Sequence, residues 1–330
     1  MTSMANTVQE LDSQRIKSYA KKAGFDLCGI TSAEVIPEAR NRLLKWLERS
    51  LEGEMDYMRK DPERRSDPSL SLPGAMSVIV LALNYFQPDT EVAKPESGLV
   101  AKYARGKDYH KVTEKKIEAL LRMISEDYSD LDTRDMFKWF VDYGPALERS
   151  YAARAGMGYL GKNSMLITPE FGSWVLLSMI ITKLELEPDK NRESEQATCG
   201  VCQRCITNCP THAIIAPGVI DSNKCISYLT IEKRGPFVLE TQSNLHSRVF
   251  GCDICQDVCP HNYDSIRTAH EEFTDSSGVG EFVDLKTIVR MESRKEFLDW
   301  CAGTPLTRPK LEGIKRNAAT ILSENSENTL

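Results

Sequence analysis

The sequence has little of what several common classes of protein need. Only five of its 330 residues are histidine, so a site built on several imidazoles is not expected. No apolar run approaches the roughly 20 residues of a membrane-spanning helix, since the longest cover residues 78–83 and 174–181. Residues 1–15 carry no apolar segment of a secretory signal. We therefore expect a cytoplasmic protein that does not cross a membrane.

An excess of positive charge is also missing. The chain has 42 Lys and Arg against 48 Asp and Glu, a formal net charge of −6. This balance argues against blanket electrostatic binding to nucleic acid and leaves room only for a local basic surface.

Cysteine, in contrast, is plentiful and unevenly placed. The chain has ten cysteines, and eight of them fall between Cys199 and Cys259, while Cys28 and Cys301 stand apart. A cytosolic chain of this length neither needs nor keeps a disulfide framework, so these thiols are expected to bind metal or to do chemistry. Eight thiolates are the number that two 4Fe-4S clusters require.

The spacing within this group matches a bacterial two-cluster ferredoxin. Two residues separate each of the first three cysteines, three precede the fourth, and proline follows, a run in which the fourth thiolate serves the other cluster. The second run has its first cysteine displaced along the chain. We assign cluster one to Cys199, Cys202, Cys205 and Cys259, and cluster two to Cys225, Cys252, Cys255 and Cys209.

A pair of structural zinc sites is the alternative interpretation, because pairs of thiols also fit tetrahedral zinc. Three closely spaced thiols followed by Cys-Pro are more typical of iron–sulfur electron transfer. A protein with two such clusters and a separate domain is either an electron carrier or a reductase with its reactive centre in that domain.

The rest of the chain predicts a mixed architecture. Helical and extended patterns alternate over the first 185 residues, which is typical of an α/β layered sheet, and residues 164–168 and 173–182 are expected to form a hairpin that completes it. Charged, unpatterned stretches then suggest three units: an α/β domain at 1–190, a ferredoxin-like domain at 191–270 and a short helical segment at 271–330.

A glycine-rich loop lies at residues 156–161. Its spacing fits a dinucleotide fingerprint, but a helix is expected before it and a strand after it, the reverse of what that motif needs. A P-loop is equally disfavoured, since Asn163 replaces the required Ser or Thr. Lys162 and Asn163 can still donate hydrogen bonds to a large polar ligand, and a tight interdomain turn is the alternative.

Several strings together resemble the epoxyqueuosine reductase family, over roughly residues 10–320. The strings are RSDP at 65–68, PGA at 73–75, YARGKDYH at 103–110, VDYGP at 141–145, ARAG at 153–156, GKN at 161–163 and CISYLTIE at 225–232. The resemblance implies a cobalamin-binding α/β domain followed by the two-cluster domain. It also implies an oxidoreductase that performs the last step of queuosine biosynthesis, converting epoxyqueuosine to queuosine at the tRNA wobble position. Some members add a helical-repeat domain at the carboxyl end, which we expect to be absent or reduced here.

By the same resemblance, Asp142 matches the family's proton donor. Removing an epoxide oxygen as water takes two electrons and two protons, and an alkoxide leaves poorly unless it is protonated. Asp142 follows the apolar stretch 137–141, so we expect burial to raise its pKa; the alternative is an Asp that only caps the following turn. The histidine of the 108–110 string is expected to start a helix rather than to ligate cobalt. The candidates for contacting cobalamin are Arg65, Tyr103, Asp142, Lys162, Asn163 and Ser227.

The expected partners are tRNA with a queuosine-type anticodon and an external low-potential electron donor, whose electrons pass through the clusters to cobalamin one at a time. Seven basic residues against four acidic ones at 290–316, together with Lys233 and Arg234, could contact tRNA, or they could form a solvated surface. Two other functions stay open: a ferredoxin-like electron carrier without its own substrate, and a corrinoid reductase of a substrate other than tRNA.

Overall fold

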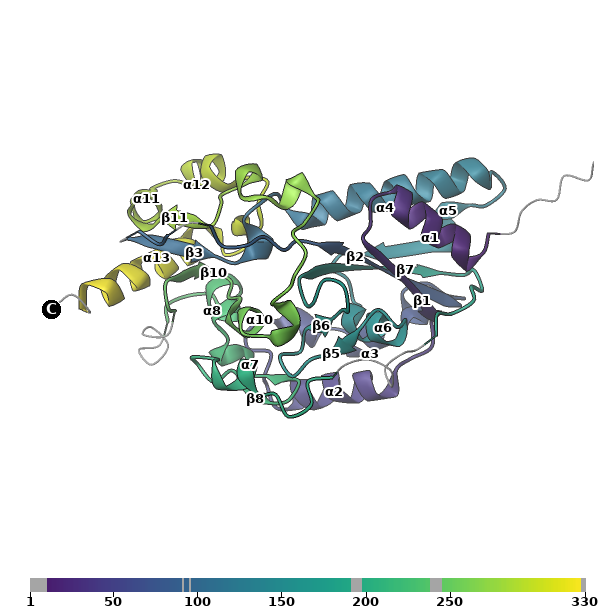
Figure 1. The fold of residues 1–330 in the computed structure, drawn as a ribbon, viewed down its shortest axis with the longest axis horizontal. Helices are drawn as coiled ribbons and strands as arrows, with labels where there is room; N and C mark the ends of the chain where they lie inside the picture. Colours follow the sequence, from purple (N-terminus) through teal and green to yellow (C-terminus); the bar gives the residue numbers. More distant parts are fainter. Residues whose placement is uncertain (1–10, 91, 95, 191–197, 238–244, 328–330) are drawn as a thin grey trace, which may run out of the picture.

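The computed structural model describes residues 11–90, 92–94, 96–190, 198–237 and 245–327. The molecule is elongated, with one sheet towards each end and the cysteine-bearing segment below and between them (Figure 1). No helix in these ranges is both long and apolar enough to cross a membrane.

The larger sheet has four strands, and every neighbouring pair in it is antiparallel. Their order is β1 (Leu27–Ser32), β2 (Ser77–Asn84), β7 (Val175–Thr182) and β4 (Phe137–Phe140). All eight residues of β2 are buried, because successive side chains enter apolar clusters on opposite faces of the sheet. The sheet is therefore layered as the sequence predicts, but its strands are antiparallel.

Helices cover both faces of this sheet. Helices α1 (Ser13–Lys22) and α4 (Tyr109–Asp127) pack on one face, and α6 (Glu148–Arg154) packs on the other (Figure 1). The remaining helices of this part are α2 (Pro37–Glu48), α3 (Pro62–Ser66) and α5 (Thr133–Met136).

The predicted hairpin of residues 164–168 and 173–182 is wrong. Strand β6 (Leu166–Ile167) pairs instead with β5 (Tyr159–Leu160), and only a single bridge joins Thr168 to Gly172. Strand β7 pairs instead with β2 along its whole length and with β4 over residues 179–182.

The second sheet combines segments that are far apart in the sequence. Strand β3 (Ser97–Val100) pairs in parallel with β10 (Arg248–Phe250) and antiparallel with β11 (Phe282–Asp284). The helices that pack with it are α8 (Ile226–Ile231), α11 (Leu285–Arg290), α12 (Arg294–Cys301) and α13 (Lys310–Glu327). The division at residues 190 and 270 stays a prediction, and the core around this sheet extends across both positions.

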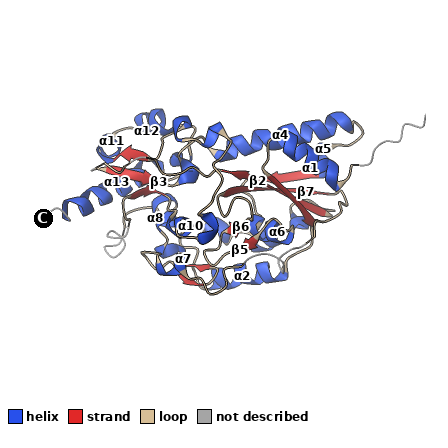
Figure 2. Cartoon of the chain, viewed as in Figure 1, coloured by secondary structure: helices blue, strands red, loops and turns tan. Residues whose placement is uncertain are grey.

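The cysteine segment is built from short elements. They are α7 (Arg204–Thr207), α10 (Ile254–Asp257), β8 (Ile214–Ala216) and β9 (Val219–Ile220). Loops make up much of the rest of this segment, as the tan stretches of Figure 2 show.

Candidate functional site

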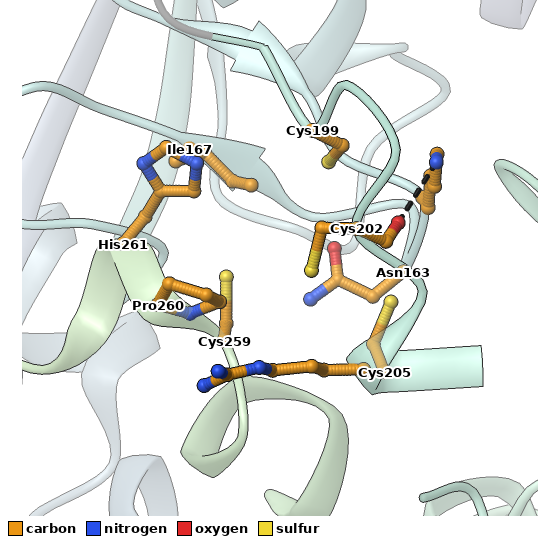
Figure 3. A pocket seen from close by; sticks show the side chains of 10 residues that line it. Asn163, Ile167, Cys199, Cys202, Cys205, Cys259, Pro260 and His261 are labelled. Atoms are coloured by element: carbon orange, nitrogen blue, oxygen red, sulfur yellow. Dashed lines mark hydrogen bonds between the residues drawn. The ribbon is translucent and has the colours of Figure 1, made fainter. Parts of the chain in front are cut away.

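Four cysteines face one common space. Cys199, Cys202, Cys205 and Cys259 line one pocket that is partly open to solvent. Figure 3 shows their sulfur atoms directed towards the space beside the Asn163 side chain. The three thiols of the first run and one from the second run thus meet across more than 50 residues of sequence, which is the crossed grouping expected for cluster one.

The space that these thiols line fits a cluster better than a single metal ion. Tetrahedral zinc holds sulfur at about 2.3 Å, so four ligands would lie roughly 3.8 Å apart and leave no pocket between them. Among the residues that the structure describes, no three Cys, His, Asp or Glu side chains form a site for one metal ion. An iron–sulfur cube, in contrast, occupies the space between its four thiolates.

The other four cysteines are also close to one another. Cys209 raises the pKa of Cys225, and Cys225 in turn raises the pKa values of Cys252 and Cys255, in each case as an addition to the larger effect of burial. Cys205 of the first group also affects Cys255, so the two groups are neighbours. This is the arrangement expected for two adjacent clusters.

The surroundings of the thiols suit ligands to a positively charged group. Burial raises the pKa of Cys252 to about 12, so without nearby positive charge the thiol would stay neutral. Backbone amides point at several sulfurs: Ala213 N–H donates to Cys209 Sγ at 3.3 Å, and amides of residues 227 and 228 favour the thiolate of Cys225. These donors and the iron of a cluster together stabilise thiolates in a dry site.

Lys162 and Asn163 lie against the cysteines. The Lys162 ammonium donates to the carbonyl oxygens of Gly200 and Cys202 at 2.7 and 2.8 Å, and Asn163 Nδ2 donates to the carbonyl of Cys255 at 3.3 Å. The glycine loop brings them there. It follows α6 and contains β5, and a Cβ at Gly158 would lie 2.2 Å from the carbonyl oxygen of Ile167. The structure therefore places both residues beside the cysteine loops.

Asp142 occupies a tight turn directly after β4. Its φ is +60°, and Tyr143 N–H donates to the carbonyl of Val141 at 2.6 Å, so three residues reverse the chain. A left-handed conformation is uncommon outside glycine, although Asp adopts it more readily than most residues, and it is often found at functional sites. The turn holds the carboxylate out from the end of the sheet.

Two side chains from the start of α4 contact this carboxylate. The Tyr109 hydroxyl donates to Asp142 Oδ2 at 2.6 Å, and His110 Nε2 lies 3.8 Å from the same oxygen. The other ring nitrogen of His110 lies 2.8 Å from Asp108 Oδ1, and Asp108 also caps the helix. His110 is thus a helix-start residue, as predicted. The sequence strings contained Tyr109 and His110, but only the fold shows that they meet Asp142.

The predicted burial of Asp142 is wrong. Its side chain is 67% exposed, because the turn directs it outward instead of back over the apolar strand. The rings of Tyr143 and Tyr57 near it are 58% and 44% exposed. An acid at this position therefore cannot depend on burial for its proton.

The remaining candidate contacts separate into two places. Arg65 donates to the carbonyl oxygens of Gly144 and Tyr57, and Tyr103 packs on Tyr109 with ring centroids 6.0 Å apart, so both lie by Asp142. Ser227 lies in the first turn of α8, two residues after Cys225. Tyr103 also contacts Phe250 at 6.1 Å, which places it between the carboxylate and the strand that leads to Cys252.

The basic residues predicted to contact tRNA are partly used within the protein. Arg308 pairs with Glu232 at 2.9 and 3.1 Å, and Arg316 donates to the carbonyls of Leu229, Lys233 and Gly235. Lys233 pairs with Glu54, and Lys295 with Asp299. Counting the basic residues at 290–316 therefore overestimates the number of side chains that are free to bind phosphate.

Comparison with protein families identifies two regions. Residues 198–262 match the family described as 4Fe-4S double cluster binding domain, and residues 65–142 match the family described as Epoxyqueuosine reductase QueG, DUF1730. The first match covers all eight clustered cysteines, from Cys199 to Cys259.

Individual relatives match across nearly the whole chain. The epoxyqueuosine reductase of Leadbetterella byssophila is 38% identical over 94% of this chain and 98% of its own, and that of Cyclobacterium marinum is 38% identical over 96% and 99%. A crystal structure of epoxyqueuosine reductase with an epoxyqueuosine-modified tRNA stem loop superimposes with a TM-score of 0.85 at 30% identity, covering 96% of this chain and 82% of that one.

A structure of the Bacillus subtilis epoxyqueuosine reductase, with a catalytic aspartate loop swung out of the active site, superimposes with a TM-score of 0.84 at 30% identity over the same shares of the two chains. The similarity thus extends through the carboxylate region as well as the cysteine segment, which a simple electron carrier would not require. Because it spans both parts at this level of identity, the chain belongs to the epoxyqueuosine reductase family.

Proposed function

We propose that this oxidoreductase converts epoxyqueuosine to queuosine at the wobble position of tRNA, with Asp142 as the acid that protonates the leaving oxygen. The single observation that carries the assignment is the Asp142 turn. Its outward carboxylate is held by the buried Tyr109 hydroxyl at 2.6 Å, and Tyr103 lies between Tyr109 and Phe250, on the strand before Cys252. The aspartate loop of the Bacillus subtilis relative supports the same role.

The chemistry explains why an acid is needed. Both C–O bonds of the epoxide break, a carbon–carbon double bond forms and the oxygen leaves as water, at the cost of two electrons and two protons. A positioned acid raises the rate of such a step by about 10²–10⁴-fold. Asp142 is exposed, so a large substrate can reach it without a change in the core.

Tyr109 and His110 position this acid. Burial raises the pKa of Tyr109 well above its usual value, so its hydroxyl stays a donor throughout the neutral range. His110 is held by Asp108, whose pKa is lowered, against the effect of burial, by the hydrogen bond with the imidazole. The carboxylate is therefore held through one oxygen, Oδ2.

The donor sets fit the family's cofactors. The eight cysteines supply ligands for two 4Fe-4S clusters, and for cobalamin the buried Nε of Arg65, which has no partner among the described residues, is a donor suited to a corrin amide. When bound, cobalamin supplies electrons to the substrate carbon, and the clusters supply them singly from outside. Arg65 and Tyr103 are our proposed cobalamin contacts beside Asp142.

Two roles proposed from the sequence change with the geometry. Lys162 and Asn163 hold the cysteine loops by hydrogen bonds, so we propose that they shape the surroundings of cluster one. The partly open side of that pocket, lined by Arg204 and His261, is where an external low-potential donor would deliver electrons. Ser227 remains a proposed contact next to Cys225.

The test is an anaerobic assay of the reconstituted enzyme on tRNA that contains epoxyqueuosine. We expect queuosine from the wild type, a loss of at least about 10²-fold in Asp142→Asn, and no change in Asp130→Asn, an exposed aspartate after α4. Equal conversion by Asp142→Asn and the wild type would refute the assignment of the acid, and no conversion by any of them would refute the function.

A further inference from the structure

One buried carboxyl close to the site has no role so far. Glu148 begins α6, six residues after Asp142, and the residue as a whole is partly exposed. Its Oε1 atom, however, is buried and has no hydrogen-bond partner among the described residues. A carboxylate oxygen left in this state is costly, whereas a protonated carboxyl is tolerated.

Burial keeps Glu148 neutral, and three charged groups face it. They are Asp142 from the turn after β4, Arg65 from α3 and Arg149 from its own helix. Burial raises the pKa of Glu148 to about 8, and the negative charge of Asp142 adds to the effect. A hydrogen bond from the backbone of Glu148 itself and the two arginines only partly offset it. At neutral pH, Glu148 therefore holds a proton beside Asp142, whose side chain is open to water.

The reaction needs such a proton. Each turnover consumes two protons, and Asp142 can give only one before it must be protonated again. Neighbouring carboxyls with different surroundings commonly divide the work of storing and delivering protons.

We propose that Glu148 is the proton store that recharges Asp142 during each turnover. This inference rests on the proposed function. The Asp142 acid gives its proton to the epoxide oxygen, Glu148 transfers its proton to the Asp142 carboxylate, and Asp142 then gives this second proton to the oxygen as it leaves as water. Asp142 and Glu148 both end as carboxylates and take up two protons from solvent before the next turnover, and the two electrons come from the external donor through the clusters.

Glu148→Gln tests the proposal, because the amide has nearly the same shape and cannot deliver an acid proton. The kcat/KM of the wild type is expected to fall as the pH rises through about 8. In Glu148→Gln this limb of the profile disappears and turnover near neutral pH drops by about 10–100-fold. Glu148→Asp, which keeps a carboxyl, is expected to keep the limb, and Glu118→Gln, an exposed position of α4, is expected to match the wild type.

A second measurement separates proton delivery from folding. Since Asp142 is exposed, small buffer acids can protonate it directly, so turnover of Glu148→Gln is expected to rise with the concentration of a weak acid at constant pH and ionic strength, while the wild type is insensitive. A Glu148→Gln enzyme with the pH profile of the wild type, or with a lowered rate that buffer acids do not raise, would overturn the proposal. An inactive wild type would instead refute the proposed function.

Discussion

Asn317 on α13 offers the sharpest test of how the second cluster is held. Its side chain is fully buried, and Nδ2 donates to the carbonyls of Thr230 and Val249 at 2.8 and 2.9 Å. Thr230 lies in α8, which Cys225 caps, and Val249 lies in β10, just before Cys252. One amide thus joins the two segments that bring distant ligands to the same cluster.

Replacing Asn317 with alanine removes both donors and leaves two buried carbonyl oxygens without them. Each such loss costs about 1–3 kcal/mol, so we expect the free energy of unfolding to fall by about 2–6 kcal/mol. Anaerobic denaturant unfolding followed by tryptophan fluorescence measures this change, and iron analysis after a chelator challenge measures retention of the second cluster.

The control is Asn223→Ala, which removes an exposed amide that donates to the carbonyl of Ser50 at 3.2 Å. Surface changes of this kind usually stay within about 0.5 kcal/mol. If Asn317→Ala shifts stability no more than this control and keeps all its iron, the side chain does not hold the two segments together, and our explanation of the second site is wrong.

Four further outcomes follow from the geometry. Cys259→Ser is expected to lose about half of the iron per chain, because one member of the first group is supplied only by the second cysteine run; full iron content would contradict the grouping. Tyr109→Phe is expected to lower turnover by about 10-fold with an unchanged melting temperature, since it removes one hydrogen bond to a charged oxygen. Gly106→Ala is expected to lower the melting temperature, because a Cβ there would lie 2.4 Å from the carbonyl oxygen of Glu272. Finally, the folded-state pKa of Glu148 is raised, so the unfolded chain loses this proton at lower pH and the stability of the wild type falls between about pH 4.5 and pH 8. The melting temperature of Glu148→Gln, measured relative to the wild type, is expected to rise across that range, and a constant difference would contradict this prediction.

The meeting of Cys199, Cys202, Cys205 and Cys259 around one space could be predicted because short spacings restrict where thiols can go. Three thiols separated by two residues each can surround only one cluster, and the count of eight then determines how many remain. What the sequence could not show is that Cys225 reaches the second group through α8, since nothing local in the sequence sets the packing of α8 against β10 and α13.

The sheet was predicted less well, for a physical reason. Strand β7 and the residues before it read as two apolar runs joined by a turn, which is the pattern of a hairpin. In the structure β7 pairs with β2 and β4, which are distant in the sequence, and such long-range pairing cannot be read from a local pattern.

The environment of Asp142 shows the same limit. An aspartate after an apolar strand suggested burial, but the sign of φ at one residue decides whether its side chain turns inward or outward. Lys162 shows it too: its charge suggested a ligand contact, whereas two backbone carbonyls of the cysteine loop take its hydrogen bonds. In both cases the residue type indicated a functional position, but the sequence did not show where the side chain points.

The position of β3 determines whether the part of the chain with the larger sheet can be separated from the part with the cysteines. Residues 97–100 leave the first sheet's half of the chain and become the central strand of the other sheet. A fragment cut after residue 190 would expose that strand on both edges, and the remaining fragment would lose the middle of its own sheet. Neither piece should be soluble alone. Electron delivery by the cysteine segment and the reaction on the modified base are therefore expected to require expression of the whole chain.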